Sequence, residues 1–274
     1  MQIGIINNLR GEGDVFGKVR QFGLKVCQLA CWDVDLYSEA MARRVVEGSK
    51  ASGVRVCALW AGYPGEHEWS FTKGPTTLGF VPPELREMRV AALKKGADFA
   101  KKIGAPAVIT HCGFVPENMT DPLYPGTLNA IKQVAQHCEK LGLGFWFETG
   151  QETPVVLLRV IEDIGARNLG VNLDPANLIL YGKGNPVDAL DVVGRHIRNV
   201  HIKDGLYPTD GRNLGKETPV GKGRVDFPLL FKRLKEEFSY DGELIIEREI
   251  KEGQEQNRDI REAIEKLKSW GGVV

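Results

Sequence analysis

The sequence predicts an α/β protein of the (β/α)8 barrel class, and three observations support this. Short apolar or β-branched segments recur eight times along the chain, and segments with helical periodicity lie between them. Strict alternation of strands and helices indicates parallel strands. The chain has 274 residues, close to the roughly 250 residues of such a barrel. We therefore expect one barrel domain over residues 1–274.

The eight expected strands are short and rich in Val, Ile, Leu and Phe, as buried parallel strands are. The first is expected to end early, because Asn7 and Asn8 follow it. In chain order the strands are 3–6, 24–30, 54–60, 105–111, 143–148, 169–174, 197–203 and 243–247.

Helices are expected where apolar residues recur with a 3.6-residue period. The longest begins with proline and ends before glycine, which are typical helix boundaries. The expected helices are 38–53, 82–104, 126–142, 153–165, 185–196, 226–238 and 257–270. The irregular segment 61–83 has the length of a lid or binding loop.

An open, doubly wound sheet is the main alternative fold. It would carry a G-x-G-x-x-G fingerprint after its first strand. Residues 11–17 read GEGDVFG, which does not fit that spacing and is interpreted as a loop. The closed barrel is therefore preferred.

The composition excludes several classes of protein. The net charge is zero and the pI is about 7.0, which argues against nucleic acid or an acidic membrane as partner. No run approaches the roughly 20 apolar residues of a membrane span, and the N-terminus does not resemble a signal peptide. The five cysteines are scattered, without a CxxC pair. These features predict a cytoplasmic protein with reduced thiols.

Four residues that bind metals stand at the ends of adjacent expected strands: Glu148, Asp174, His201 and Glu247. Active sites of these barrels lie at the carboxyl ends of the strands. Two glutamates, an aspartate and a histidine suit a divalent metal ion. A single such residue could equally cap the next helix or pair with a basic side chain, but four together favour a metal site.

Several motifs resemble the sugar phosphate isomerase/epimerase family of xylose isomerase-like TIM barrels, which includes ketose 3-epimerases, hydroxypyruvate isomerase and inosose dehydratase. The motifs are FETGQET (147–153), VNLDPANL (171–178), NVHIKDG (199–205), GKGRVDF (221–227) and IIERE (245–249). The resemblance covers nearly the whole chain. It is fairly specific for the superfamily and weakly specific for the reaction.

The resemblance implies that Glu148, Asp174, His201 and Glu247 bind one divalent ion, whether Mn, Co, Zn, Mg or Fe. It also implies that Glu148 and Glu247 are catalytic. One takes a proton from the carbon beside a carbonyl and the other returns it from the opposite face, while the metal stabilises the enediolate between these steps. Glu249 competes with Glu247 for the ligand position.

The sequence departs from these relatives at two positions. Asn177 stands where family members often have histidine, so we expect one metal rather than two. Pro154 stands where ketose 3-epimerases have a glutamate that binds substrate, which argues against ketose epimerisation itself.

Four residues are candidates to bind substrate, and three of them have a structural alternative. His111 could contact substrate or be a hydrogen-bonded core histidine. Lys203 could bind a substrate oxygen or phosphate, or pair with a neighbouring acid. Trp32 could stack on a sugar or simply pack at the rim, and Asn177 lies beside the expected metal ligands.

The predicted function is a metal-dependent isomerase or epimerase of a small sugar, sugar phosphate or polyol. The main alternative is a dehydratase on the same scaffold. An endonuclease IV-like metal hydrolase is less favoured, because the chain has few histidines. A non-catalytic sugar-binding barrel is also less favoured, because the chain keeps all four expected metal ligands. The expected partner is a small carbohydrate, and the resemblance leaves room for a homo-oligomer.

Overall fold

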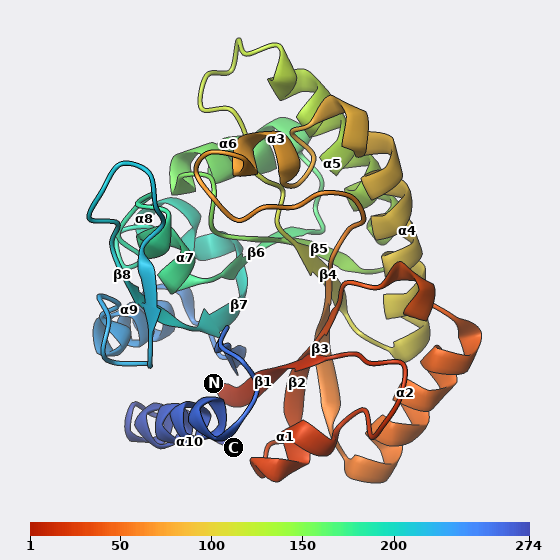
Figure 1. Cartoon of the computed structure of the whole chain (residues 1–274), viewed down its shortest axis with the longest axis vertical. Helices are drawn as coiled ribbons and strands as arrows, with labels where there is room; N and C mark the ends of the chain where they lie inside the picture. Colours follow the sequence, from red (N-terminus) through yellow and green to blue (C-terminus); the bar gives the residue numbers. More distant parts are fainter.

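The computed structural model describes residues 1–274 and confirms the closed barrel (Figure 1). Eight parallel strands close in the order β1-β10-β7-β6-β5-β4-β3-β2. Each overlaps one expected strand. The strands are β1 (Gln2–Asn8), β2 (Val26–Cys31), β3 (Arg55–Ala61), β4 (Ala107–Thr110), β5 (Gly144–Glu148), β6 (Leu169–Leu173), β7 (Ile197–Ile202) and β10 (Glu243–Ile246).

Strand β1 is longer than predicted. It continues through Asn7 and Asn8, which pair with Leu29 and Ala30 of β2. The Asn7 side chain is buried, and its Nδ2 donates to the carbonyl oxygen of Val15 at 2.6 Å. A satisfied polar side chain is tolerated inside a strand, so the expectation of an early end was wrong.

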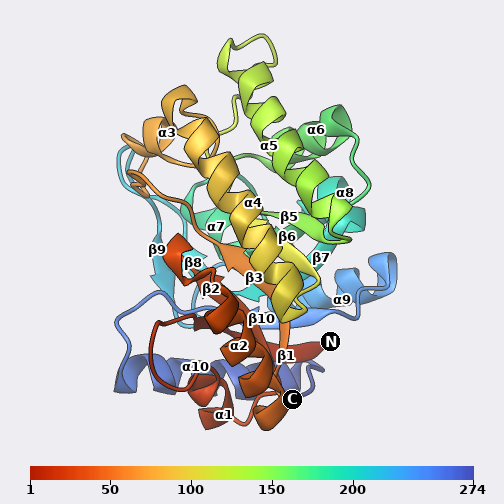
Figure 2. The same ribbon diagram turned by 90° about the vertical axis from the view of Figure 1, so that its right-hand side faces the viewer.

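Helices surround the barrel, with α4 and α5 side by side along one flank (Figure 2). The chain ends are joined by a bridge between Gln2 and Val273. The longer helices are α2 (Glu39–Ser52), α4 (Arg86–Ile103), α5 (Leu123–Lys140), α6 (Pro154–Ile164), α9 (Phe227–Phe238) and α10 (Gln254–Ser269). The shorter ones are α1 (Gly17–Gln21), α3 (Gly74–Thr77), α7 (Pro175–Leu180) and α8 (Leu190–Val193). No helix combines the length and apolar character needed to cross a bilayer.

The helix expected over 185–196 is mostly absent. Only α8 and a short 3₁₀ turn at Gly194–His196 form. The side chain of Asn185 accepts hydrogen bonds from the N–H groups of Val187 and Asp188, as a helix N-cap does. The turns that follow include i→i−3 bonds, from Leu190 to Val187 and from Asp191 to Asp188, which are typical of a 3₁₀ turn rather than an α-helix. The sequence also gave no signal for α7 or for the hairpin of β8 (Asp204–Leu206) and β9 (Lys216–Thr218).

The barrel interior has an apolar side and a polar side. Ala30, Ala58, Trp60, Ala107 and Ile109 form an apolar cluster from β2, β3 and β4. Gln28, Asn172, Asn199 and His201 are fully buried as well. Buried polar groups need partners, and these four form one hydrogen-bonded chain beneath the candidate site.

The segment 61–83 is tied to the barrel by Arg89 of α4. This guanidinium is fully buried and lies 4.3 Å from the centre of the Tyr63 ring. It donates to four backbone carbonyls of the segment, those of Pro64, Glu66, Thr77 and Gly79. Charge-assisted hydrogen bonds are strong, so the segment is anchored at several points along its length.

Candidate metal centre and active site

Four strand ends bring Glu148, Asp174, His201 and Glu247 together. One potential ligand atom from each lies within 4.8 Å of the others. The Nδ1 atom of His201 is 3.3 Å from Oε1 of Glu148, 3.6 Å from Oδ2 of Asp174 and 3.2 Å from Oε2 of Glu247. The set comes from β5, from the residue after β6, from β7 and from the residue after β10.

The donor atoms of this cluster are suited to a divalent ion. His201 Nδ1 and Asp174 Oδ2 are buried and lack a hydrogen-bond partner within the chain. Leaving such groups unpaired is costly, and three carboxylates in one buried cluster repel each other. Oxygen and imidazole ligands accommodate Mg²⁺, Mn²⁺, Co²⁺, Zn²⁺ or Fe²⁺. The residues present therefore fit a metal ion.

The orientation of His201 is set by a residue on the other side of the barrel interior. Its Nε2 lies 2.8 Å from Oε1 of Gln28 and 3.0 Å from the amide Nδ2 of Asn172. In the tautomer that donates from Nε2 to Gln28, the lone pair is on Nδ1, the atom that faces the three carboxylates. This is the usual arrangement for a histidine that binds metal.

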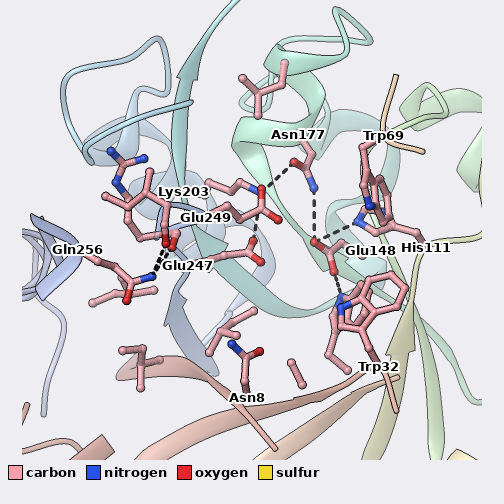
Figure 3. Close-up of a pocket in the computed structure, with 18 of the residues that line it drawn as sticks. Asn8, Trp32, Trp69, His111, Glu148, Asn177, Lys203, Glu247, Glu249 and Gln256 are labelled. Atoms are coloured by element: carbon pink, nitrogen blue, oxygen red, sulfur yellow. Dashed lines mark hydrogen bonds and ion pairs between the residues drawn. The ribbon is translucent and has the colours of Figure 1, made fainter. Parts of the chain in front are cut away.

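Glu148 is held by several groups besides the cluster (Figure 3). The indole N–H of Trp60 donates to Oε2, while the His111 ring lies 3.4 Å from Oε1. Asn177 Nδ2 is also 3.4 Å from Oε1. Burial alone would raise the pKa of Glu148, but the imidazoles of His111 and His201 lower its pKa well below the ordinary value. The carboxyl group is therefore ionised at neutral pH.

Lys203 is buried beside the cluster. Its Nζ lies 2.6 Å from Oε2 of Glu249, 3.3 Å from Oε2 of Glu247 and 3.6 Å from Oδ2 of Asp174. Burial would lower the pKa of Lys203, but these carboxylates raise it well above its usual range. Glu249, the competing ligand candidate, is thus paired with Lys203 and lies outside the four-residue cluster.

A cavity of about 580 Å³ opens next to the cluster, within the usual size range of small-molecule sites. All four candidate substrate contacts line it: Trp32, His111, Asn177 and Lys203. The Trp32 side chain is 39% exposed. Asn177 bridges two charged groups, because its Nδ2 is near Glu148 and its Oδ1 accepts from Lys203.

Some cavity residues were not predicted from the sequence. Trp69 and His67 lie in the segment 61–83 and line the cavity. His67 is exposed and stacks on Trp32 with 4.6 Å between ring centres. Gln151, in the FETGQET motif, is buried in the cavity wall. The one sequence feature that could have indicated these cavity residues is the number of aromatic residues in the long segment 61–83.

Comparisons with known proteins agree with the observed fold. A solved xylose isomerase domain protein from Planctomyces limnophilus is 33% identical, with a TM-score of 0.91 over 98% of this chain and 96% of that one. A D-tagatose 3-epimerase-like protein shares the fold at 18% identity, with a TM-score of 0.75 over 98% and 97% of the two chains.

A curated relative and a family model extend the comparison. The uncharacterized protein MJ1311 of Methanocaldococcus jannaschii is 25% identical over 206 residues, which is 69% of this chain and 64% of that protein. The chain therefore spans less than two thirds of that relative. The family model for xylose isomerase-like TIM barrels matches residues 16–270. The chain belongs to the xylose isomerase-like TIM barrel family.

Proposed function

We propose that the chain is a divalent-metal-dependent isomerase or epimerase that moves a proton at the carbon beside a carbonyl of a small carbohydrate. The observation that carries this proposal is the placement of Glu148 and Glu247. Both face His201 Nδ1, at 3.3 and 3.2 Å, from strands separated by β6 and β7. Two carboxylates that enter one site from different sides can serve as a base and an acid.

Glu148, Asp174, His201 and Glu247 would hold the metal ion. When bound, the ion supplies Lewis-acid stabilisation of negative charge on substrate oxygens. The chain's own groups orient these ligands, because Gln28 fixes His201 and Trp60 fixes Glu148.

The two glutamates have different surroundings, as distinct acid and base roles require. Glu148 is almost fully buried and is contacted by His111, His201 and the indole N–H of Trp60. The Glu247 side chain is 14% exposed and lies 3.3 Å from the Lys203 ammonium group. Both residues line the cavity, so both have access to a bound substrate.

Metal content and proton exchange test the proposal together. The protein is purified without added metal, reconstituted and analysed by plasma mass spectrometry as wild type, Glu148→Gln, Asp174→Ala and Glu249→Gln. We expect one divalent ion per chain in the wild type and in Glu249→Gln, and much less in the other two variants. Glu249→Gln is the matched control because Glu249 lies outside the cluster.

The reaction is then followed by NMR in D₂O with a panel of ketoses, their phosphates and inososes. An isomerase or epimerase incorporates deuterium at the carbon beside the carbonyl, and chelation of the metal stops the exchange. Loss of water from the substrate would identify the dehydratase alternative instead. A chain that binds no metal after reconstitution with Mn, Co, Zn, Mg or Fe would contradict the proposal.

A further inference from the structure

We propose that the cavity selects carbohydrates without a phosphate group. The backbone and side-chain groups that would bind a phosphate near the cavity are already occupied by the protein's own carboxylates. The inference rests on the proposed function in one respect only, that the ligand is a carbohydrate.

Asp204, directly after Lys203, fills a nest of backbone N–H groups. Its Oδ2 accepts from the N–H groups of Gly221 and Gly223, both at 2.8 Å, and its Oδ1 accepts from Val225 at 3.1 Å. A Cβ atom on Gly223 would lie only 2.1 Å from Oδ1 of Asp204. Glycine at this position therefore lets the carboxylate enter the nest.

The place of this nest in the fold matters for phosphate binding. Loops that follow the last two strands of such barrels, with a helix N-terminus, frequently form the phosphate site, and backbone nests bind anions. Here the nest lies between the seventh strand of the barrel, β7, and α9, and it holds a carboxylate that is 1% exposed. The first turn of α9 is capped by Asp226, which accepts from the N–H of Leu229 at 3.0 Å.

The loop after β10 offers no better place for an anion. Glu252 lines the cavity there, and Glu255 lies in the first turn of α10. Their negative charges oppose a phosphate group near that helix end.

The lysine and arginine side chains that line the cavity are also neutralised. Each is paired with one to three carboxylates. Lys203 pairs with Glu249 at 2.6 Å, Glu247 at 3.3 Å and Asp174 at 3.6 Å, Arg248 with Glu217 at 2.8 Å and Asp259 at 2.9 Å, and Lys18 with Glu252 at 3.4 Å. A phosphate dianion entering the cavity would have to displace one of these partners and then face the released carboxylate. That exchange is unfavourable because like charges repel.

The unpaired polar groups of the cavity wall suit neutral hydroxyl groups. Both polar atoms of the Gln151 amide are buried and lack a hydrogen-bond partner within the chain, as does Nδ1 of His111. Nη1 of Arg248 also lacks one, but its charge is paired with Glu217 at 2.8 Å. Hydroxyls donate and accept at once, so they can satisfy such groups.

One wall of the cavity is aromatic. The Trp32 ring centre lies 5.0 Å from that of Trp60 and 6.2 Å from that of Trp69. Figure 3 shows Trp32, Trp69 and His111 on the side of the cavity away from Lys203. Such a surface covers the C–H face of a sugar ring and gains from its burial.

Binding measurements that need no turnover test this inference. The metal-loaded protein is titrated by calorimetry with matched pairs: D-fructose and its 6-phosphate, D-glucose and its 6-phosphate, and myo-inositol and its monophosphate. We expect at least one neutral member to bind, at least tenfold more tightly than its phosphorylated partner. Inorganic phosphate should neither bind to the protein nor displace the bound neutral carbohydrate.

Trp32→Ala should weaken binding of the neutral sugar at least tenfold without changing metal content. Tyr207→Ala is the matched control, because Tyr207 is 40% exposed and does not line the cavity. Tighter binding of any phosphorylated member, or no binding by any neutral member, would overturn the inference. So would unchanged binding by Trp32→Ala. These outcomes are separate from the metal and exchange tests of the proposed function, because binding preference is measured without reaction.

Discussion

The Oε1 atom of Gln28 on β2 lies 2.8 Å from Nε2 of His201 on β7, across the interior of the barrel. Two other strands, β1 and β10, separate them around the wall. When the imidazole donates its Nε2 proton to Gln28, the Nδ1 lone pair is free to face the carboxylates and a metal ion. We therefore infer that Gln28 positions His201 in the candidate metal centre.

Replacing Gln28 with leucine should weaken metal binding by about 10- to 100-fold, the usual cost of losing a group that orients a metal ligand. The dissociation constant of Co²⁺ can be measured by competition with a chelator. Gln21→Leu, an exposed change at the end of α1, controls for the substitution itself. An affinity equal to wild type would show that His201 keeps its orientation without Gln28.

Lys203→Met should destabilise the metal-free protein by about 3–5 kcal/mol, because it leaves Glu247, Glu249 and Asp174 without their buried cation. Urea unfolding gives the free energy. The exposed Lys222→Met serves as control. A loss below about 1 kcal/mol would mean that the carboxylates relax or take up protons at little cost.

Arg89→Met should release the segment 61–83 from α4. Four carbonyl groups lose their donor, and hydrogen bonds to charged groups contribute about 1.5–3 kcal/mol each. Hydrogen–deuterium exchange should rise across the segment, and sugar binding should weaken while metal content stays the same.

Lys101→Met, an exposed change on the same helix, should leave exchange in the segment unaltered. If Arg89→Met also left it unaltered, the segment would be held by its apolar contacts instead, those of Leu78, Phe80 and Val81.

Glu152 should make stability depend on pH. Burial raises its pKa from 4.5 to about 7, against the opposing effects of His111 and Lys183. The folded protein thus holds a proton that the unfolded chain has released. Stability falls as pH rises from about 4.5 to 7, by about 3 kcal/mol in total.

Glu152→Gln removes this dependence. By urea unfolding, the variant should be more stable than wild type by about 3 kcal/mol at pH 8 and by less than about 1 kcal/mol at pH 5. The exposed Glu139→Gln should show no such trend. An equal difference at both pH values would show that the carboxyl group does not titrate in this range.

The sequence by itself determined the barrel and the four residues at its strand ends. Buried parallel strands leave continuous apolar runs, and a carboxylate or imidazole that ends such a run must lie at the carboxyl rim. This local pattern was enough to single out Glu148, Asp174, His201 and Glu247 as one group, and the structure brings them within 4.8 Å. It did not reveal the short helix α7, which Asp174 caps from a strand end.

Only the tertiary structure decided which groups pair across the barrel. Gln28 meets His201, Arg89 holds the segment 61–83, and Asp204 enters the Gly221–Gly223 nest. Gln28 and His201 are 173 residues apart in the chain, and Arg89 is 10 residues from Gly79, one of its partners. Asp204 is 17 and 19 residues from Gly221 and Gly223. Their contact depends on the curvature and closure of the barrel and on the course of the loops, and no local periodicity encodes these. For the same reason, Lys203, which the sequence offered as a phosphate contact, is paired with Asp174, Glu247 and Glu249 from other parts of the fold.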